Sequence, residues 1–352
     1  MSLRFDSFLE RILYHPQHGY YSKCPKFGKQ GDFYTSPSVH GFFAEIISEQ
    51  FLQVWNDAGK PHPFTLVELG PGDATLACQV LNSTRQRFRD FHRCIQYVGL
   101  EVSSALAERQ SERLSQYDNA RIVCGFLPKE GLEPFTGCFF SNEFFDALPF
   151  RRLRREGSGW IECFVEIVPD SIRERWTSTD WKPSLKSDAR KHSARGIVES
   201  DSNDPVSRVQ SFEWRDQFET FYQFATGALQ RGWMFHFDYG DVWENLDPLG
   251  TLRTFHRHSL GSDPYVRLGE QDVTASVNFS HLLALGERYG FESRLLSQRE
   301  YLIERGILEK IAVRFEGEGP EKHLQEKLAV KNLIVPGGIS DYFKVLVQRK
   351  VN

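Results

Sequence analysis

The 352-residue chain lacks several features that would assign a class of protein directly. No apolar run approaches the ~18 residues of a membrane-spanning helix, so we expect no membrane span. The six cysteines are scattered without a Cys-x-x-Cys pair, which favours free thiols over a thiolate zinc site. The formal net charge of −4 provides no basic field for nucleic acid. Because the N-terminus also has neither an apolar signal region nor an Arg- and Ser-rich presequence, we expect a cytoplasmic protein.

Two common nucleotide-binding signatures are also missing. The Gly70-Pro71-Gly72 turn is followed by Asp73-Ala74-Thr75, and not by the Gly-Lys-Ser/Thr of a phosphate-binding P-loop. A dinucleotide site needs a third glycine, where Thr75 stands here, and an acidic residue about 20 residues further on. The next acidic residue that ends an expected strand is Glu101, which is more distant. These absences argue against a P-loop and weaken NAD or FAD as ligands.

The sequence also has few residues at the spacings that are typical of metal ligands. His15 and His18 form one histidine pair, and His256 and His258 form another, but no cysteine or carboxylate partner stands out by spacing. We therefore expect no metal site.

What the chain does contain is a regular alternation of strand and helix patterns, which predicts an α/β fold with a mostly parallel sheet and helices on both faces. The expected strands are 64–69, 95–101, 121–124, 137–141 and 233–238. The expected helices among them are 76–89, 103–116 and 213–230. Further elements are expected as helices at 3–14, 39–58, 279–289 and 298–305, and as strands at 291–296 and 342–349.

The segment 151–210 interrupts this alternation. Strands at 151–155 and 160–168 are joined by Gly157-Ser158-Gly159, which predicts a hairpin. The arginine-rich run 151–155 fits the solvent face of a strand, with a basic patch as the alternative. Residues 169–210 are polar and weakly patterned, and we expect a long surface excursion there.

The glycine turn stands between an expected strand and an expected helix, where its backbone N–H groups can approach a ligand. Glu-x-Gly-x-Gly from Glu68 to Gly72, with Glu101 ending the next strand, is the usual signature of class I methyltransferases. The glycines would admit the methionine part of S-adenosylmethionine, and Glu101 can accept hydrogen bonds from both ribose hydroxyls. An ordinary tight turn is the alternative interpretation.

Acidic residues also follow two later strands. Glu143 and Asp146 come directly after strand 137–141, and Asp238 ends strand 233–238. Because ligands bind at the carboxyl ends of parallel strands, we expect Glu143 and Asp146 near the donor methyl and Asp238 on the acceptor or a water. A capping or turn role is the alternative for each acid. Arg253 and Asp272 lie in expected loops that can cover the site or pair with each other.

Six ordered blocks resemble one family. They are Gly31–Pro37, Glu68–Gly72, Asn142–Pro149, Phe237–Gly240, Gly250–Arg253 and Asp272–Phe279. In these blocks the chain resembles the MidA family, the bacterial relatives of the mitochondrial complex I assembly factor that methylates a protein arginine. The match runs from about residue 5 to 347 and is weak across 169–210. Ala74 stands where the family usually has a further glycine.

The resemblance implies the class I methyltransferase fold, a Rossmann-like, mostly parallel seven-stranded sheet with helices on both faces. It also implies an N-terminal helical segment, 1–60, that closes over the cofactor site, and an inserted hairpin and polar excursion at 151–212. The core is then built from 61–150 and 213–352, with substrate-covering loops at 241–278.

The resemblance further implies a methyltransferase that uses S-adenosylmethionine and acts on a protein arginine, with a complex I subunit as candidate substrate and no nucleic acid. Monomer and dimer both stay open. The alternatives are another acceptor, or a non-catalytic assembly factor that binds the donor. The implied donor-binding residues are Gly31, Asp32, Thr35, Glu68, Gly70, Gly72, Glu101, Phe126, Leu127 and Asn142. The implied catalytic residues are Glu143, Asp146 and Asp238.

Overall fold

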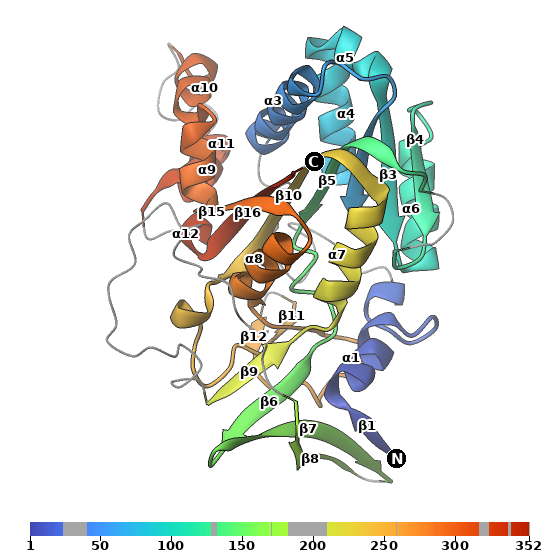
Figure 1. The fold of residues 1–352 in the computed structure, drawn as a ribbon, viewed down its shortest axis with the longest axis vertical. Helices are drawn as coiled ribbons and strands as arrows, with labels where there is room; N and C mark the ends of the chain where they lie inside the picture. The colour runs from blue at the N-terminus through green and yellow to red at the C-terminus, as the bar shows by residue number, and fades with distance from the viewer. Residues whose placement is uncertain are drawn as a thin grey trace.

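A central sheet organises the molecule (Figure 1). The computed structural model describes residues 1–23, 41–127, 132–169, 171–181, 210–257, 259–316, 324–336 and 339–351. The strands of the central sheet follow the order β15-β16-β10-β5-β2-β3-β4, and β14 pairs with the end of β10. Their bounds are β2 (Phe64–Leu69), β3 (Ile95–Glu101), β4 (Ala120–Cys124), β5 (Phe135–Asn142), β10 (Leu229–Asp241), β14 (Val277–Asn278), β15 (Phe291–Ser297) and β16 (Phe343–Lys350).

The expected mostly parallel sheet is confirmed. Strands β4, β3, β2, β5 and β10 pair in parallel, whereas β16 runs antiparallel between β10 and β15. The main path holds seven strands, and β14 makes an eighth member among the described residues. The carboxyl ends of these five parallel strands therefore lie at the same edge of the sheet.

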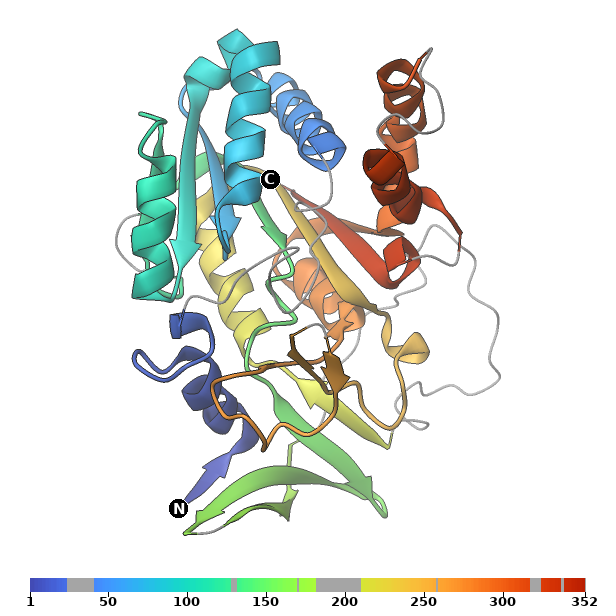
Figure 2. The ribbon, with the colours of Figure 1, turned by 180° about the vertical axis from the view of Figure 1, so that it is seen from behind.

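Helices cover both faces of this sheet (Figures 1 and 2). They are α3 (Gly41–Asp57), α4 (Thr75–Arg87), α5 (Arg89–Cys94), α6 (Ser104–Leu114), α7 (Gln217–Ala228), α8 (Phe279–Arg288) and α9 (Gln298–Glu304). Successive strand side chains point to opposite faces. In β5, Phe140 packs in the cluster with α3 and α4, whereas Phe139 packs in the cluster with α7 and α8. Strands buried on both faces explain why their sequences are almost continuously apolar.

A second, antiparallel sheet lies beside the central one, at the lower end of both views (Figures 1 and 2). It consists of β1 (Ser2–Arg4), β6 (Arg151–Glu156), β7 (Gly159–Val168), β8 (Ser171–Thr179) and β9 (Ser211–Trp214). Glu156 pairs with Gly159, so the expected hairpin is confirmed. A small third sheet contains β11 (Arg253–His256), β12 (Ser259–Gly261) and β13 (Asp272–Thr274).

Several expected boundaries are wrong. Residues 213–214 belong to β9, which pairs with β6, and the helix expected from 213 begins only at Gln217. The excursion 169–210 contains β8, paired along the whole of β7, while 182–209 lie outside the described residues. The N-terminal helix α1 (Phe5–Tyr14) is preceded by β1, because residues 2–4 pair with β7. Three helices were not expected: α10 (Ile307–Arg314), α11 (Leu324–Ile334) and α12 (Ile339–Tyr342).

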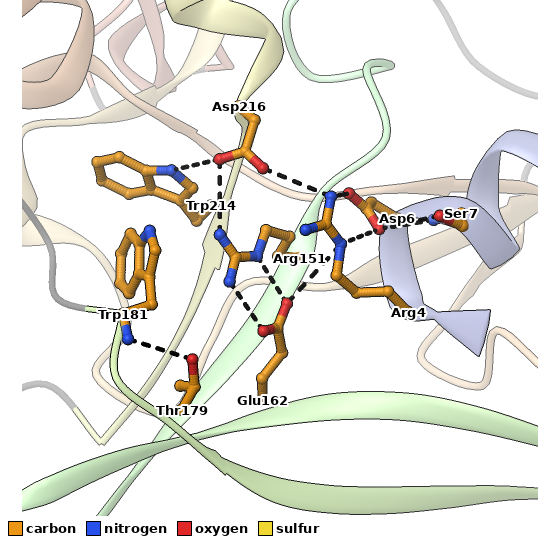
Figure 3. A network of polar contacts seen from close by, with 9 residues as sticks. All are labelled: Arg4, Asp6, Ser7, Arg151, Glu162, Thr179, Trp181, Trp214 and Asp216. Carbon is orange, nitrogen blue, oxygen red and sulfur yellow. Dashed lines mark hydrogen bonds and ion pairs between the residues drawn. The ribbon is translucent and has the colours of Figure 1, made fainter. Parts of the chain in front are cut away.

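The arginine run at the start of β6 is only partly a solvent face. Arg151 is 7% exposed and binds Glu162 with two parallel hydrogen bonds, at 2.6 and 2.8 Å. Arg4 and Asp216 extend this network, so that β1, β6, β7 and the residue before α7 are joined by charge (Figure 3). The alternation of a strand places Arg151 inward and Arg154 in solvent.

Two further properties concern the described chain as a whole. None of its described helices combines the length and apolar character needed to cross a bilayer. Five of the six cysteines are free thiols, and Cys24 lies outside the described residues.

We expect Glu162→Gln to lower the free energy of unfolding by about 3 kcal/mol, because it removes the carboxylate that binds the buried Arg151 guanidinium through two hydrogen bonds and leaves only the more distant Asp216. Chemical denaturation monitored by circular dichroism measures this change. Asp90→Asn is the control, because the Arg93–Asp90 pair is exposed on both sides and contributes little. Equal midpoints for the two variants would contradict the assigned role of the network.

Candidate active site

A cavity of about 800 Å³ lies at the edge where the parallel strands end. Its walls come from the ends of β2, β3, β5 and β10, from α1, and from the β11–β13 sheet. Nine of the residues proposed from the sequence line it: Glu68, Gly70, Gly72, Glu101, Phe126, Leu127, Asn142, Glu143 and Asp146. Gly31, Asp32 and Thr35 lie outside the described residues. The volume is in the range of cofactor sites.

The turn after β2 has an unusual backbone. Gly70, Gly72 and Ala74 all have left-handed φ angles, of 62°, 59° and 60°. A Cβ on Gly70 would lie 2.9 Å from Cδ2 of Phe144, so this position has no room for a side chain. Glycine is therefore required at Gly70 both for its conformation and for the close approach of the next loop.

Ala74 faces the hydrophobic core, whereas Gly70 and Gly72 line the cavity. Its side chain is fully buried in the hydrophobic cluster beneath α3 and α4, and it does not line the cavity. The departure from the family pattern therefore adds a methyl group to the core and does not narrow the cavity.

Glu101 is held in place from two sides. One carboxylate oxygen accepts the backbone N–H of Ser103 at 2.8 Å, and the other accepts Nε2 of Gln110 at 2.9 Å. The same Nε2 donates to the carbonyl of Gly72 at 2.9 Å. Burial raises the pKa of Glu101. Gln110 thus couples the acidic end of β3 to the glycine turn, a role that its helical position in the sequence did not reveal.

Glu68 lies at the end of β2 and is 2% exposed. Its carboxyl accepts the hydroxyl of Tyr97 at 2.6 Å. Burial raises the pKa of Glu68 to about 8, and the hydrogen bond from Tyr97 only partly opposes this shift. The side chain is therefore mainly protonated at neutral pH.

The loop after β5 carries the proposed acceptor acids. Glu143 has a left-handed φ of 51°, and its N–H donates to the carbonyl of Phe237 at 2.8 Å. Asn142 donates from Nδ2 to a Glu143 carboxylate oxygen at 3.0 Å. Such strained non-glycine residues persist only where the surroundings fix them, and they cluster at functional sites.

Asp146 is 5% exposed and lines the cavity. Its Oδ2 accepts the hydroxyl of Thr274 at 3.0 Å, whereas its Oδ1 is buried without a hydrogen-bond partner in the described structure. A buried carboxylate oxygen that lacks a donor is costly. Asp146 therefore keeps one oxygen without a donor at the border of the cavity.

Asp238 corrects an expectation. Its side chain is fully buried, is not part of the cavity lining, and accepts the backbone N–H groups of Phe145, Asp146 and Tyr239. Burial and the neighbouring acids Asp146 and Glu143 raise the pKa of Asp238. It does not reach an acceptor but fixes the loop after β5, which is the turn role that the sequence left open.

Several lining residues have polar roles that sequence patterns did not assign. Tyr21 donates its hydroxyl to Asp272 at 3.0 Å, and Tyr14 donates to the carbonyl of Ala147 at 2.8 Å. The Arg253 guanidinium lies 4.7 Å above the ring of Tyr239 and donates to the hydroxyl of Ser276. Arg253, Tyr239 and Asp272 lie in the ordered blocks, whereas no sequence pattern assigned a role to Tyr14 and Tyr21, because loop side chains follow no periodicity.

Flat apolar surfaces complete the donor end of the cavity. Phe126 and Phe144 both line it, with ring planes inclined by 17° and centroids 6.4 Å apart. Rings in this arrangement offer their faces to a planar ligand.

These features define a class of protein. A glycine turn after β2, an acid at the end of β3 and acids after β5 meet at one edge of an open, mostly parallel sheet, as in the S-adenosyl-L-methionine-dependent methyltransferases of α/β fold. Residues 46–296 match the model of a family described as S-adenosyl-L-methionine-dependent methyltransferase. The chain belongs to this family.

Named relatives agree with this assignment. The chain is 30% identical over 312 residues to the protein arginine methyltransferase NDUFAF7 homolog of Drosophila melanogaster, with 80% of this chain and 66% of that protein covered. It is 28% identical over 341 residues to the Rattus norvegicus protein arginine methyltransferase NDUFAF7, with 91% and 74% covered. The chain thus spans about two thirds to three quarters of the length of these mitochondrial relatives.

A solved structure agrees in both fold and ligand. A superfamily member from Burkholderia thailandensis, bound to S-adenosyl-homocysteine, has a TM-score of 0.78 at 26% identity, with 99% of this chain and 88% of that chain covered. S-adenosyl-L-methionine is the cofactor of the family. The residues present fit it, because the backbone of Gly70 and Gly72 and the Glu101 carboxylate border the same cavity.

We expect Glu68→Gln to stabilise the protein at alkaline pH. The unfolded chain releases this proton near pH 4.5 and the folded protein near pH 8, so stability falls between these values by about 1.4 kcal/mol per pH unit. Glutamine stays neutral and can still accept from Tyr97.

Calorimetric Tm values at pH 5, 7 and 9 test this expectation. The variant should match the wild type at pH 5 and exceed it at pH 9. The exposed Glu108→Gln variant is the control and should follow the wild-type profile. A constant difference between Glu68→Gln and the wild type at every pH would contradict a raised pKa.

We expect Ala74→Gly to leave donor binding unchanged. The free energy of unfolding should also change little. Relief of the left-handed alanine backbone contributes about 1–2 kcal/mol, which is offset by the lost burial of the methyl group and by the added chain entropy of glycine. The Kd for S-adenosyl-homocysteine, measured by calorimetry, should stay within about twofold. Gly70→Ala is the contrasting variant, because its Cβ meets Phe144, and it should bind at least about tenfold more weakly. Tenfold tighter binding by Ala74→Gly would show that the methyl obstructs the donor.

Proposed function

We propose that this protein transfers the methyl group of S-adenosylmethionine to an arginine side chain of a protein, with a subunit of respiratory complex I as candidate acceptor. The relatives in fly and rat carry the name of protein arginine methyltransferase. The observation that carries the proposal is the acidic acceptor side of the cavity, where Glu143 and Asp146 stand after β5.

The charge of the cavity suits a cationic acceptor. Its described lining holds one guanidinium, that of Arg253, and seven carboxyl side chains: Glu10, Glu68, Asp73, Glu101, Glu143, Asp146 and Asp272. Glu68 is mainly neutral, so the negative charge comes from the other six. An arginine side chain enters as a planar cation that carboxylates bind through paired hydrogen bonds. The unpartnered Oδ1 of Asp146 is one such acceptor.

Glu143 and Asp146 would act on the acceptor in two ways. The bound donor supplies an electrophilic methyl group on a sulfonium sulfur. The two carboxylates orient the guanidinium so that one nitrogen faces this methyl group, which is the main contribution in a displacement of this kind. As the nitrogen–carbon bond forms and the sulfur–carbon bond breaks, the nitrogen loses a proton. We assign the uptake or relay of that proton to Glu143.

The donor end follows from the same proposal. Gly70 and Gly72 line the donor, Glu68 supports the turn, Glu101 holds the ribose hydroxyls, and Asn142 borders the methionine part. Phe126 and Leu127 enclose the adenine. Gly31, Asp32 and Thr35 would belong to the N-terminal segment 1–60, which we propose closes over the donor.

The broader organisation stays part of the proposal. The donor-binding core would comprise 61–150 and 213–352, with the hairpin region 151–212 and the loops 241–278 serving acceptor choice. We propose a cytoplasmic location on the basis of the free thiols, with monomer and dimer both open. The next experiment distinguishes arginine methylation from methylation of another acceptor and from a non-catalytic assembly role.

We expect Glu143→Gln to lower kcat by at least about 100-fold, the usual contribution of a positioned acid–base group. The assay combines isotope-labelled S-adenosylmethionine with a cell extract, and mass spectrometry locates the label. Calorimetry with S-adenosyl-homocysteine should give a Kd within about twofold of the wild type. Glu112→Gln, on the exposed side of α6, is the matched control and should keep full activity.

The outcomes separate the alternatives. Label in methylarginine of a protein supports the proposal. Label only in RNA or small molecules would point to another acceptor, and donor binding without any transfer would point to an assembly factor. Full activity of Glu143→Gln would remove Glu143 from its assigned role.

A further inference from the structure

Four cavity-lining residues form a connected series that ends at the surface with Tyr342. The Arg253 guanidinium lies over the ring of Tyr239, and the Tyr239 ring meets that of Phe343 edge to face, with centroids 5.8 Å apart. Tyr342 follows Phe343 in the chain. We call Arg253, Tyr239, Phe343 and Tyr342 the acceptor strip.

Hydrogen bonds link Tyr239 of the acceptor strip to Asp146, the proposed acceptor acid. The hydroxyl of Tyr239 bonds that of Thr274 at 2.6 Å, and Thr274 donates to Oδ2 of Asp146 at 3.0 Å. The strip therefore forms one wall of a route from the cavity mouth to Asp146.

The two outer residues of the acceptor strip, Phe343 and Tyr342, differ strongly in solvent exposure. Phe343 is 6% exposed, whereas Tyr342 is 70% exposed although it also borders the cavity. A tyrosine ring has a large contact area and loses little side-chain entropy on binding, which makes it a frequent anchor at protein interfaces. The place of Tyr342 at the border of the cavity puts this contact area where a polypeptide bound in the site would leave it.

Ion pairs hold the backbone on both sides of Tyr342. Asp341, the preceding residue, pairs with Arg299 at 2.8 Å, and Lys344 pairs with Asp241 at 3.1 Å. These two ion pairs tie the end of α12 to α9 and the start of β16 to β10. The backbone that carries the exposed ring is therefore held in position before any partner binds, which reduces the ordering cost of binding.

We propose that Tyr342 binds the polypeptide segment that flanks the methylated arginine, and that it makes the enzyme select arginine within a protein over free arginine. This inference rests on the proposed function. The arginine side chain passes Tyr239 and Phe343, which border the cavity, on its way to Asp146. The flanking main chain then rests on Tyr342.

Free arginine and arginine within a protein differ most at the backbone. A free arginine brings charged α-ammonium and α-carboxylate groups, whereas an arginine within a chain presents neutral amides at these positions. Binding of the free amino acid therefore costs the desolvation of two further charges, and the acidic lining compensates only that of the ammonium. This cost and the contact of the flanking chain with Tyr342 both favour a polypeptide acceptor.

The test compares wild type, Tyr342→Ala, Tyr342→Phe and Val313→Ala. Val313, on α10, is 75% exposed and does not line the cavity, so it is the matched control for an exposed side chain. The acceptors are a protein extract from cells that lack the enzyme, titrated over concentration, and free L-arginine. Label in methylarginine is measured as an initial rate, and the Kd for S-adenosyl-homocysteine is measured in parallel.

We expect Tyr342→Ala to raise the apparent KM for protein acceptor about tenfold, with kcat, the Kd for S-adenosyl-homocysteine and any rate on free arginine unchanged. Tyr342→Phe should stay within about twofold of the wild type, since the ring makes the contact, and Val313→Ala should match it. A Tyr342→Ala variant with wild-type KM, or wild-type enzyme that prefers free arginine, would overturn the inference while leaving arginine methylation intact. A wild-type enzyme that methylates no arginine would overturn the proposed function itself.

Discussion

The buried guanidinium of Arg215 is the interaction on which the site depends. It is 1% exposed and donates to four main-chain carbonyls, those of Asp146, Leu148, Ala275 and Ser276. Burial lowers the pKa of Arg215, and the nearby Asp146 and Asp238 oppose this shift. Because a buried charge is costly unless its donors are satisfied, these carbonyls cannot move independently. The loop after β5 and the segment after β13 are thereby held against each other, one carrying Asp146 and the other following Thr274.

Around this anchor the structure keeps strained residues in place. Glu143 has a left-handed backbone, yet it is fixed by its bond to Phe237, and Asp238 on the same strand accepts the next N–H groups of the loop. The strand β10 thus serves as a template for the loop after β5, its parallel neighbour. Pairing in the middle of a buried sheet provides the stability that offsets such local strain.

The sequence determined the buried strands well and the distant contacts hardly at all. The bounds of β2 and β3 were predicted without error, because strands buried on both faces read as apolar runs. β8 escaped prediction, since most of its side chains are exposed and only its pairing with β7 makes it a strand. Asp238 was expected to end its strand, but β10 continues to Asp241, and sequence cannot show which way a carboxylate points. Tyr21 meets Asp272 across 251 residues of chain, a contact that no local pattern encodes.

The acids of the cavity show how one residue type takes on different tasks. At the donor end, Glu68 receives a hydrogen bond from Tyr97, and Glu101 receives bonds from Ser103 and Gln110. These carboxyl groups are positioned by the protein before a ligand arrives. At the acceptor end, Asp146 is fixed through Oδ2 alone, and its Oδ1 has no donor in the described structure. Since folding tolerates few such groups, the unpaired oxygen sets Asp146 apart from the acids whose hydrogen bonds the protein itself supplies. Under the proposed function, it is the group that an arginine acceptor would pair.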